Sequence, residues 1–332
     1  MSLVVGKTSE STITQFIMKT ISKLILLVFI SCFSSNLMGQ SQGITDADKI
    51  TGDLTFLVAN DTGRNGYYDQ KAIARTMGQM AEKIKPECVF AVGDIHHFDG
   101  VQSTSDPLWK SNYEDIYNHP ELMIAWYPVL GNHEYRGNTQ AMIDYSNVSR
   151  RWRMPARYYT KRFKKHGTTI RFVLLDTAPL ISRYHGNADK YPDADKQDMN
   201  RQLRWADSVL TAANEDWIIV MGHHPIYAET DKNQKERKDL QKNLDPILRK
   251  HKVDAYICGH LHNFQHHRAP GSDMDYIVNS AGALSREVKP VKSTVFCSPE
   301  TGFSAITAGK DSLNIYFIDK NGKIIHTVTR HK

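Results

Sequence analysis

Pairs of residues able to bind metal ions recur at five places in this 332-residue chain. Residues 258–263 set His260 and His262 two positions apart, just after an apolar run. Because side chains i and i+2 of extended chain project to the same side, both imidazoles can reach one site. Taken alone, two such histidines are more typical of a solvated edge or a polar cluster than of a metal site.

Four other stretches place Asp, Asn or His directly after short apolar runs: residues 60–63, 93–97, 131–134 and 222–225. A sheet would deliver all of them to one edge. These side chains are borderline to hard ligands, suited to Zn, Mn, Fe or Mg. In a two-metal site the ions sit roughly 3.5 to 4 Å apart, so one carboxylate must bridge them. Asp94, on the turn after a strand, is the candidate bridge.

The elements that must position these residues alternate between strands and helices. Residues 54–59 and 88–92 are predicted strands, and the helical spacing in residues 68–85 between them favours a parallel pair of strands. Further strands are expected at 125–130, 158–163, 170–176, 217–221, 255–258, 276–279, 313–318 and 324–328. Further helices are expected at 108–117, 139–147, 198–213 and around Leu240 to Leu248. The Asn321-Gly322 pair indicates a hairpin. The sequence therefore predicts one α/β domain with two sheets and helices outside them.

The N-terminus has the pattern of a signal peptide. Lys19 and Lys23 precede an apolar run, residues 24–33, and small and polar residues follow. The run is shorter than the roughly 20 residues of a membrane-spanning helix. We interpret residues 1–39 as an N-terminal extension with a signal peptide, residues 40–332 as a single domain, and the protein as secreted, periplasmic or at the cell surface. An alternative is lipoprotein processing, with an acyl anchor at Cys32.

Composition excludes few functions. With 40% apolar and 23% charged residues, the chain is typical of soluble globular proteins. Loss of residues 1–39 removes three Lys and one Glu, which lowers the net charge from +6 to +4. This charge is too small to indicate nucleic-acid binding, although it suits an anionic substrate. Cys88, Cys258 and Cys297 would remain, and we expect no disulfide framework.

Together and in this order, the five stretches resemble the calcineurin-like metallophosphoesterase superfamily, and more narrowly the small purple acid phosphatases of the tartrate-resistant type. The narrower resemblance also covers residues 173–177, 202–205, 215–217 and 280–283. It extends from about residue 53 to the C-terminus. It implies a four-layer αββα sandwich of two mixed sheets flanked by helices.

The resemblance also implies roles for individual residues. Asp61 and His262 would hold a first metal ion, and Asp94 would bridge. Asn132, His223 and His260 would hold the second ion. His133 would lie in the phosphate pocket and donate a hydrogen bond to the ester or its leaving oxygen.

One position departs from the family pattern. The purple acid phosphatase motif has a tyrosine three residues after the bridging Asp, and this chain has His97. A phenolate stabilises Fe(III), which neutral imidazole does less well. We therefore expect His97 to bind the first metal, with His96 as the alternative. We expect two divalent ions (Fe, Zn or Mn) and no purple Fe(III)-tyrosinate centre.

The expected function is a binuclear phosphatase that hydrolyses phosphate monoesters of small molecules or proteins by attack of a metal-bound hydroxide. His224 and Glu229 are candidate substrate contacts. Alternatives are a phosphodiesterase, a hydrolase of phospholipid or nucleotide headgroups, and a catalytically silent binding protein. We expect solvated positions for His266, His267 and the charged stretch 232–238.

Overall fold

Apolar runs in the sequence become buried strands. Leu54–Ala59 forms β1 and Cys88–Val92 forms β2, and every residue of both is buried. The two strands pair in parallel, as the helix between them predicts. The computed structural model describes residues 46–230 and 233–332, so the predicted extension at residues 1–39 and Cys32 lie outside the described residues.

Two sheets form the centre of the fold. The first has the order β13-β12-β11-β1-β2-β3, and the second β10-β8-β9-β7-β6-β5-β4. In the first, β1, β2 and β3 are parallel, and in the second β5, β6, β7 and β9 are parallel. The remaining strands are β3 (Trp126–Val129), β4 (Tyr159–Lys165), β5 (Thr168–Leu175), β6 (Trp217–Gly222), β7 (Ala255–Cys258), β8 (Phe264–Arg268), β9 (Asp275–Asn279), β10 (Thr294–Ser298), β11 (Gly302–Ala308), β12 (Ser312–Asp319) and β13 (Ile324–His331).

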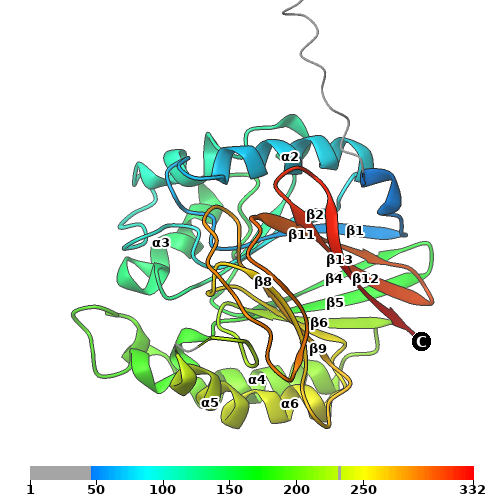
Figure 1. Cartoon of the computed structure of the whole chain (residues 1–332). Helices are drawn as coiled ribbons and strands as arrows, with labels where there is room; N and C mark the ends of the chain where they lie inside the picture. Colours follow the sequence, from blue (N-terminus) through cyan, green and yellow to red (C-terminus); the bar gives the residue numbers. More distant parts are fainter. Residues whose placement is uncertain (1–45, 231–232) are drawn as a thin grey trace, which may run out of the picture. The chain divides into compact units, whose positions relative to one another are not determined.

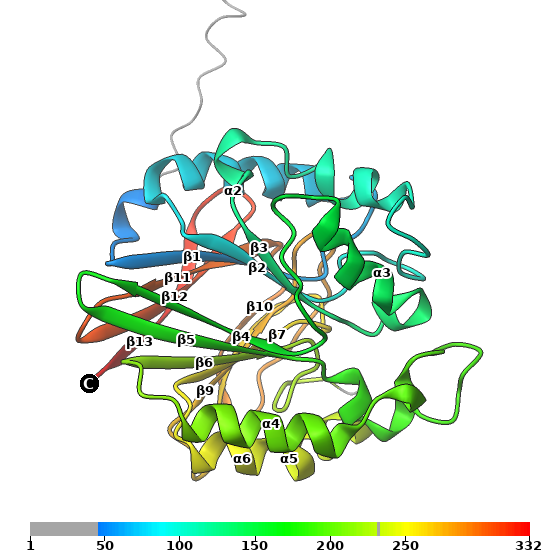
Figure 2. The same cartoon turned by 180° about the vertical axis from the view of Figure 1, so that it is seen from behind.

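Helices cover the outer faces of both sheets. Helix α2 (Gln70–Ile84) lies over β1, β2 and β11, while α4 (Met199–Thr211), α5 (Gln234–Asn243) and α6 (Asp245–Lys250) lie against the second sheet (Figures 1 and 2). The short α3 (Thr139–Asp144) follows β3. Between the sheets, Phe90 of β2 packs on Phe172 of β5 with ring centroids 4.2 Å apart. The predicted four-layer αββα architecture is confirmed.

Some elements differ from those predicted. Strand β11 was not expected, because its sequence is rich in small residues, yet it pairs with β1 at the centre of the first sheet. The expected helix at 108–117 is a π-helix over Lys110–Glu114. The predicted hairpin at Asn321-Gly322 is confirmed, with Gly322 at φ +83°.

The expectation of solvent exposure was wrong for two histidines. His266 and His267 are buried in β8, because β8 pairs with both β9 and β10. The charged stretch was expected to be solvated around the start of a helix; helix α5 begins at Gln234, and among residues 233–238 only Glu236 is buried. Cys88 and Cys258 are buried free thiols, as expected. In residues 46–230 and 233–332, no helix is both long and apolar enough to span a bilayer.

Candidate metal centre

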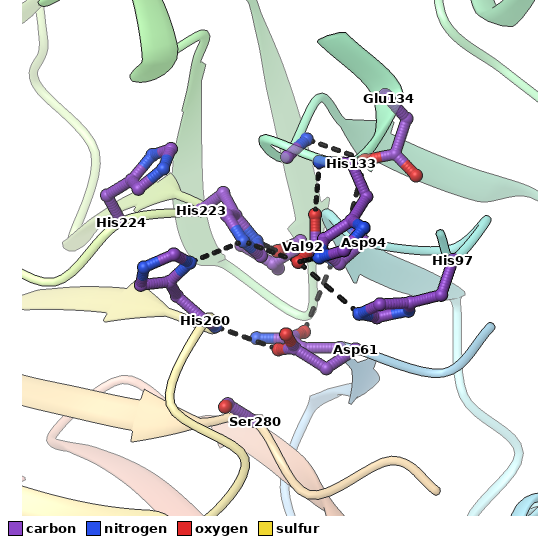
Figure 3. A network of polar contacts seen from close by, with 12 residues as sticks. Asp61, Val92, Asp94, His97, His133, Glu134, His223, His224, His260 and Ser280 are labelled. Carbon is purple, nitrogen blue, oxygen red and sulfur yellow. Dashed lines mark hydrogen bonds and ion pairs between the residues drawn. The ribbon is translucent and has the colours of Figure 1, made fainter. Parts of the chain in front are cut away.

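The parallel strands bring five polar loops to one edge of the two sheets. Asp61, Asp94 and Asn132 follow the carboxyl ends of β1, β2 and β3 in the first sheet. His223 follows β6, and His260 and His262 follow β7, in the second sheet. Figure 3 shows Asp61, Asp94, His97, His223 and His260 gathered around one point.

The backbone turns sharply at four of these residues. Asp61, Asp94, His260 and His262 have φ of +54°, +53°, +80° and +59°. A non-glycine residue in this left-handed region costs roughly 1 to 2 kcal/mol. Such outliers cluster where side-chain direction matters, and here they belong to predicted metal ligands.

Two glycines let the loops approach one another. A Cβ at Gly131 would lie 2.2 Å from Asp94 Oδ1, and a Cβ at Gly259 would lie 2.5 Å from Asp61 Oδ2. Any side chain at either position would displace a carboxylate. Glycine is therefore needed there for the close approach.

Asp94 lies at the centre of the group. Its Oδ2 atom is 3.1 Å from His223 Nε2, 3.6 Å from His97 Nε2 and 3.8 Å from His133 Nε2. Ligand atoms of Asp61, Asp94 and His223 lie within 4.8 Å of one another, as do those of Asp61, His97 and His262. The carboxylates Asp61 and Asp94 thus connect two sets of imidazoles.

Neighbouring groups select which nitrogen each imidazole presents. His223 Nδ1 donates to the Val92 carbonyl at 3.0 Å, and His262 Nδ1 to the Leu284 carbonyl at 3.2 Å, which turns Nε2 of the two rings toward Asp94 and Asp61. His260 is reversed: its Nε2 lies 3.0 Å from Glu236 Oε2 and 2.8 Å from Asn233 Nδ2, and its Nδ1 lies 3.3 Å from His223 Nε2. The ion pair with Glu236 therefore turns Nε2 away from the centre, and Nδ1 is the nitrogen that faces it.

Several buried polar atoms here have no hydrogen-bond partner in the protein. They are Asp61 Oδ1, Asn132 Oδ1 and both ring nitrogens of His97. Buried polar atoms are nearly always satisfied, so four such atoms beside two carboxylates indicate a site that binds a further group. Their chemistry, oxygen and imidazole nitrogen, fits the expected divalent metal ions.

The electrostatics agree with this fit. Burial raises the pKa of Asp61 to about 8, and the charge of Asp94 adds to this rise while His223 opposes it. Burial also acts to raise the pKa of Asp94, but the charges of His223, His133 and His97 and a hydrogen bond from His223 together outweigh it and keep that pKa well below 3.8. Burial lowers the pKa of His262 to about 3 and that of His97 well below 6.5. Burial acts to lower the pKa of His223, but Asp94 and Asp61 raise it to about 10. Metal ions would replace the proton on this ring and offset the crowded carboxylates.

The alternative first-metal residue, His96, lies apart from this donor set. Its ring packs edge-on against Trp109 at 4.5 Å, and its Nδ1 is 3.5 Å from Asn112 Nδ2. The metal-binding groups among the described residues include His97 and not His96. The ligand roles of His97 and of the other six predicted ligands remain predictions, now with a common location.

The predicted catalytic residue faces the same point. His133 Nδ1 lies 2.5 Å from the Phe98 carbonyl, to which it donates, so Nε2 is directed toward Asp94. Its main-chain N–H donates to Asp94 Oδ1 at 3.0 Å.

The two candidate substrate residues lie in different places. Glu229 lines the cavity described below. His224 is fully buried, with Nδ1 2.8 Å from Thr177 Oγ1 and Nε2 2.8 Å from Tyr184 Oη. It does not line that cavity, so its ring contacts protein groups and the geometry offers no substrate contact.

Two supporting carboxylates were missed from sequence. Glu134 accepts hydrogen bonds from the main-chain N–H groups of Asp94, Ile95, His96 and Gly131 at 2.7 to 3.0 Å, which fixes two ligand loops together. Its place directly after His133 was a signal that could have found it. Glu236 gave no such signal, because it lies far from His260 in the sequence and only the tertiary fold brings the two side chains together.

A cavity of about 520 Å³ contains this group. Asp94, Asn132, His133, His260 and His262 line it. Besides the predicted metal ligands, four cationic and two acidic side chains line the cavity. The cationic ones are Arg136, Arg183, Arg286 and Lys289, and the acidic ones are Glu229 and Glu287. The excess of positive charge suits an anionic substrate.

An αββα sandwich with an aspartate between two groups of side chains that could hold metal ions is typical of binuclear metallophosphoesterases. The sequence profile of the calcineurin-like phosphoesterases matches residues 54–264. The chain therefore belongs to the calcineurin-like phosphoesterase family. The predictions of family, fold and metal-dependent phosphatase class are confirmed.

Individual proteins similar to this chain include acid phosphatases. The chain is 32% identical to tartrate-resistant acid phosphatase type 5 of Rattus norvegicus, over 76% of this chain and 80% of that protein. It is 30% identical to purple acid phosphatase 7 of Arabidopsis thaliana, over 84% and 86%. Among solved structures it resembles GAP50, described as the anchor in the inner membrane complex of Plasmodium, with a TM-score of 0.72, 24% identity and coverage of 85% and 89%. At that identity the likeness is one of fold.

Proposed function

We propose that the protein hydrolyses phosphate monoesters at a centre of two divalent metal ions. The observation that carries this proposal is the position of Asp94, whose carboxylate lies between His223 and His97 and next to Asp61. The relatives named as acid phosphatases support the same chemistry.

The residues present fit such a centre. Asp61, His97 and His262 would hold one ion, Asn132, His223 and His260 the other, and Asp94 would be shared. When bound, two cations lower the pKa of a water molecule and neutralise phosphate oxygens.

His133 acts on the leaving group. Because its Nδ1–H is held by the Phe98 carbonyl, only Nε2 is available to the substrate. A protonated Nε2 can donate to the ester oxygen as its bond to phosphorus breaks. The negative phosphate favours that protonated ring, and Arg136 beside it in the cavity wall attracts the same anion.

Reconstitution tests the proposal directly. The metal-free protein is loaded with Zn, Mn, Fe or Mg and assayed with phenyl phosphate and with its diester. We expect about two ions per chain and faster hydrolysis of the monoester. Faster diester hydrolysis would identify a phosphodiesterase, and one ion or none without turnover would identify a binding protein.

A matched pair of variants locates the activity. Asp94→Asn should lose both ions and turnover. Asp207→Asn is the control, because Asp207 pairs with Lys250 and His251 beside the outer helices. Equal activity in the two variants would refute the site.

Processing of the N-terminus is a separate proposal. We propose export with cleavage near residue 39, and acylation at Cys32 is the competing outcome. The mass of the mature N-terminus distinguishes them, since an acylated chain begins at Cys32.

A further inference from the structure

Arg183 lines the cavity of the candidate metal centre, together with His133 and His260. Its side chain is 51% exposed, and its Nη1 atom lies 2.8 Å from Glu236 Oε1. Of the four cationic side chains that line this cavity in the described residues, only Arg183 forms an ion pair with a carboxylate. A cation that is held in place beside a reacting centre is suited to bind an anionic substrate.

The loop after β5 holds Arg183 on a fixed backbone. The main-chain N–H and the hydroxyl of Ser182 both donate to Asp239 Oδ2, at 2.8 and 2.6 Å. On the other side, Tyr184 Oη donates to Glu236 Oε1 at 3.0 Å. Both acceptors belong to α5. The residues before and after Arg183 are therefore tied to the same helix.

Two acceptors orient the guanidinium group. Arg183 Nη1 donates to Asn233 Oδ1 at 2.7 Å and to Glu236 Oε1 at 2.8 Å, which uses both of its N–H groups. Among the described residues, no acceptor contacts Nε or Nη2 of Arg183. These two nitrogens form the edge of a guanidinium that binds an oxyanion through two parallel hydrogen bonds. An arginine that is already held in this way loses little side-chain freedom when it binds a ligand.

Polar contacts connect Arg183 to the candidate metal centre. Its partner Glu236 also lies 3.0 Å from His260 Nε2, and His260 follows β7 of the second sheet. His133 follows β3 of the first sheet and lies 3.8 Å from Asp94 Oδ2. A phosphate in the cavity can therefore meet His133 from the first sheet and Arg183 from the second.

Arg183 has the chemistry to distinguish a monoester from a diester. The phosphate group of a monoester has three non-ester oxygens and up to two negative charges, whereas that of a diester has two such oxygens and one charge. A guanidinium edge donates two hydrogen bonds to the oxygens of one phosphate, and it is always charged. It therefore interacts more strongly with a monoester, through the additional oxygen and the additional charge.

We infer that Arg183 binds the non-ester oxygens of the phosphate group and thereby favours monoesters over diesters. The inference rests on the proposed function. It adds a residue that selects the class of ester, because the metal ions and the leaving oxygen are common to both classes.

Binding of inorganic phosphate to the zinc-loaded protein tests Arg183 without turnover. Arg183→Met removes the charge and both hydrogen bonds. Calorimetry should show that this variant binds phosphate about 10- to 100-fold more weakly than the wild type. Arg183→Lys keeps the charge without the planar edge, so its affinity should lie between the two. Arg249→Met is the matched control, because Arg249 pairs with the carboxylate of Asp245 but does not line the cavity, and it should bind phosphate like the wild type.

The preference between esters is the second readout. The ratio of kcat/KM for phenyl phosphate to that for its diester should fall by about 10-fold or more in Arg183→Met, mainly through slower reaction of the monoester. An unchanged phosphate affinity or an unchanged ratio would overturn the inference and leave the proposed function intact.

Metal content separates substrate binding from structural support. Arg183→Met should keep the zinc content of the wild type, because Glu236 retains its contacts with His260 and Tyr184. Loss of zinc together with phosphate affinity would make Arg183 a support of His260 and would overturn the inference. A wild-type protein that binds zinc but neither binds phosphate nor hydrolyses the monoester would overturn the proposed function, and the role of Arg183 with it.

Discussion

Glu236 offers a sharp test of how the second metal ion is held. Its Oε2 lies 3.0 Å from His260 Nε2, and its Oε1 accepts hydrogen bonds from Tyr184 Oη at 3.0 Å and Arg183 Nη1 at 2.8 Å. The side chain is 1% exposed. Glu236→Gln keeps the size of this side chain but removes its charge, so the ion pair that orients His260 becomes a neutral contact.

The size of the effect follows from the contact. A hydrogen bond to an ionised acceptor is roughly twice as strong as a neutral one. Loss of such an orienting partner typically weakens metal affinity by about 10- to 100-fold, or about 1.4 to 2.7 kcal/mol. We expect a loss of this size for the ion held by His260, and little change for the ion held by His262.

Metal content after titration with a chelator measures both affinities. Glu215→Gln is the matched control, because Glu215 is equally buried and ion-paired with Arg171, but it lies before β6 and His223 lies after that strand. The control should lose stability without losing metal. If Glu236→Gln retains two tightly bound ions, or if both ions weaken equally, the orienting role is refuted.

Three further predictions concern single residues. His97→Tyr should give the iron-loaded protein a visible tyrosinate charge-transfer band that the wild type lacks, and an existing band in the wild type would contradict our interpretation of His97. His133→Ala should lower kcat by about 100-fold or more with metal content unchanged, and normal turnover would remove His133 from the mechanism. Burial acts to raise the pKa of Asp275. Hydrogen bonds from His266, Arg330 and Arg268 outweigh burial and lower that pKa to about 2. The ionised Asp275 side chain therefore contributes about 2 kcal/mol to the free energy of unfolding above pH 4, and this contribution is lost as the pH falls through 2. The difference in stability between the wild type and Asp275→Asn, measured by thermal unfolding, should shrink at acid pH. A difference that stays constant with pH would contradict this prediction.

The predicted site residues had local signals in the sequence. Asp61, Asp94 and Asn132 each follow a buried apolar strand, and parallel strands end at a common edge. Residue type and the preceding strand were therefore enough to predict one location for them. The same reasoning placed His223 and His260 there from the second sheet.

The remaining features depend on tertiary packing. Strand β11 has no strong apolar pattern and is a strand because β1 and β12 supply its hydrogen bonds. His266 looks like a surface residue in the sequence, but Asp275 pairs with it inside the sheet. Glu236 lies in a run of charges, where nothing distinguishes the one side chain that turns inward.

Two features of the proposed first metal site, formed by Asp61, His97 and His262, influence the charge of the metal ion that it prefers. His97 stands where the family has a phenolate, and burial keeps its imidazole neutral. Arg64 adds a cation, with Nη2 3.5 Å from His262 Nε2. A unit charge at about 4 Å contributes about 4 kcal/mol at an effective dielectric constant of 20. Absence of the phenolate and presence of the guanidinium therefore both disfavour a third positive charge on the metal, and the carboxylates Asp61 and Asp94 remain to balance it. This electrostatic balance favours a divalent ion whichever element the cell supplies.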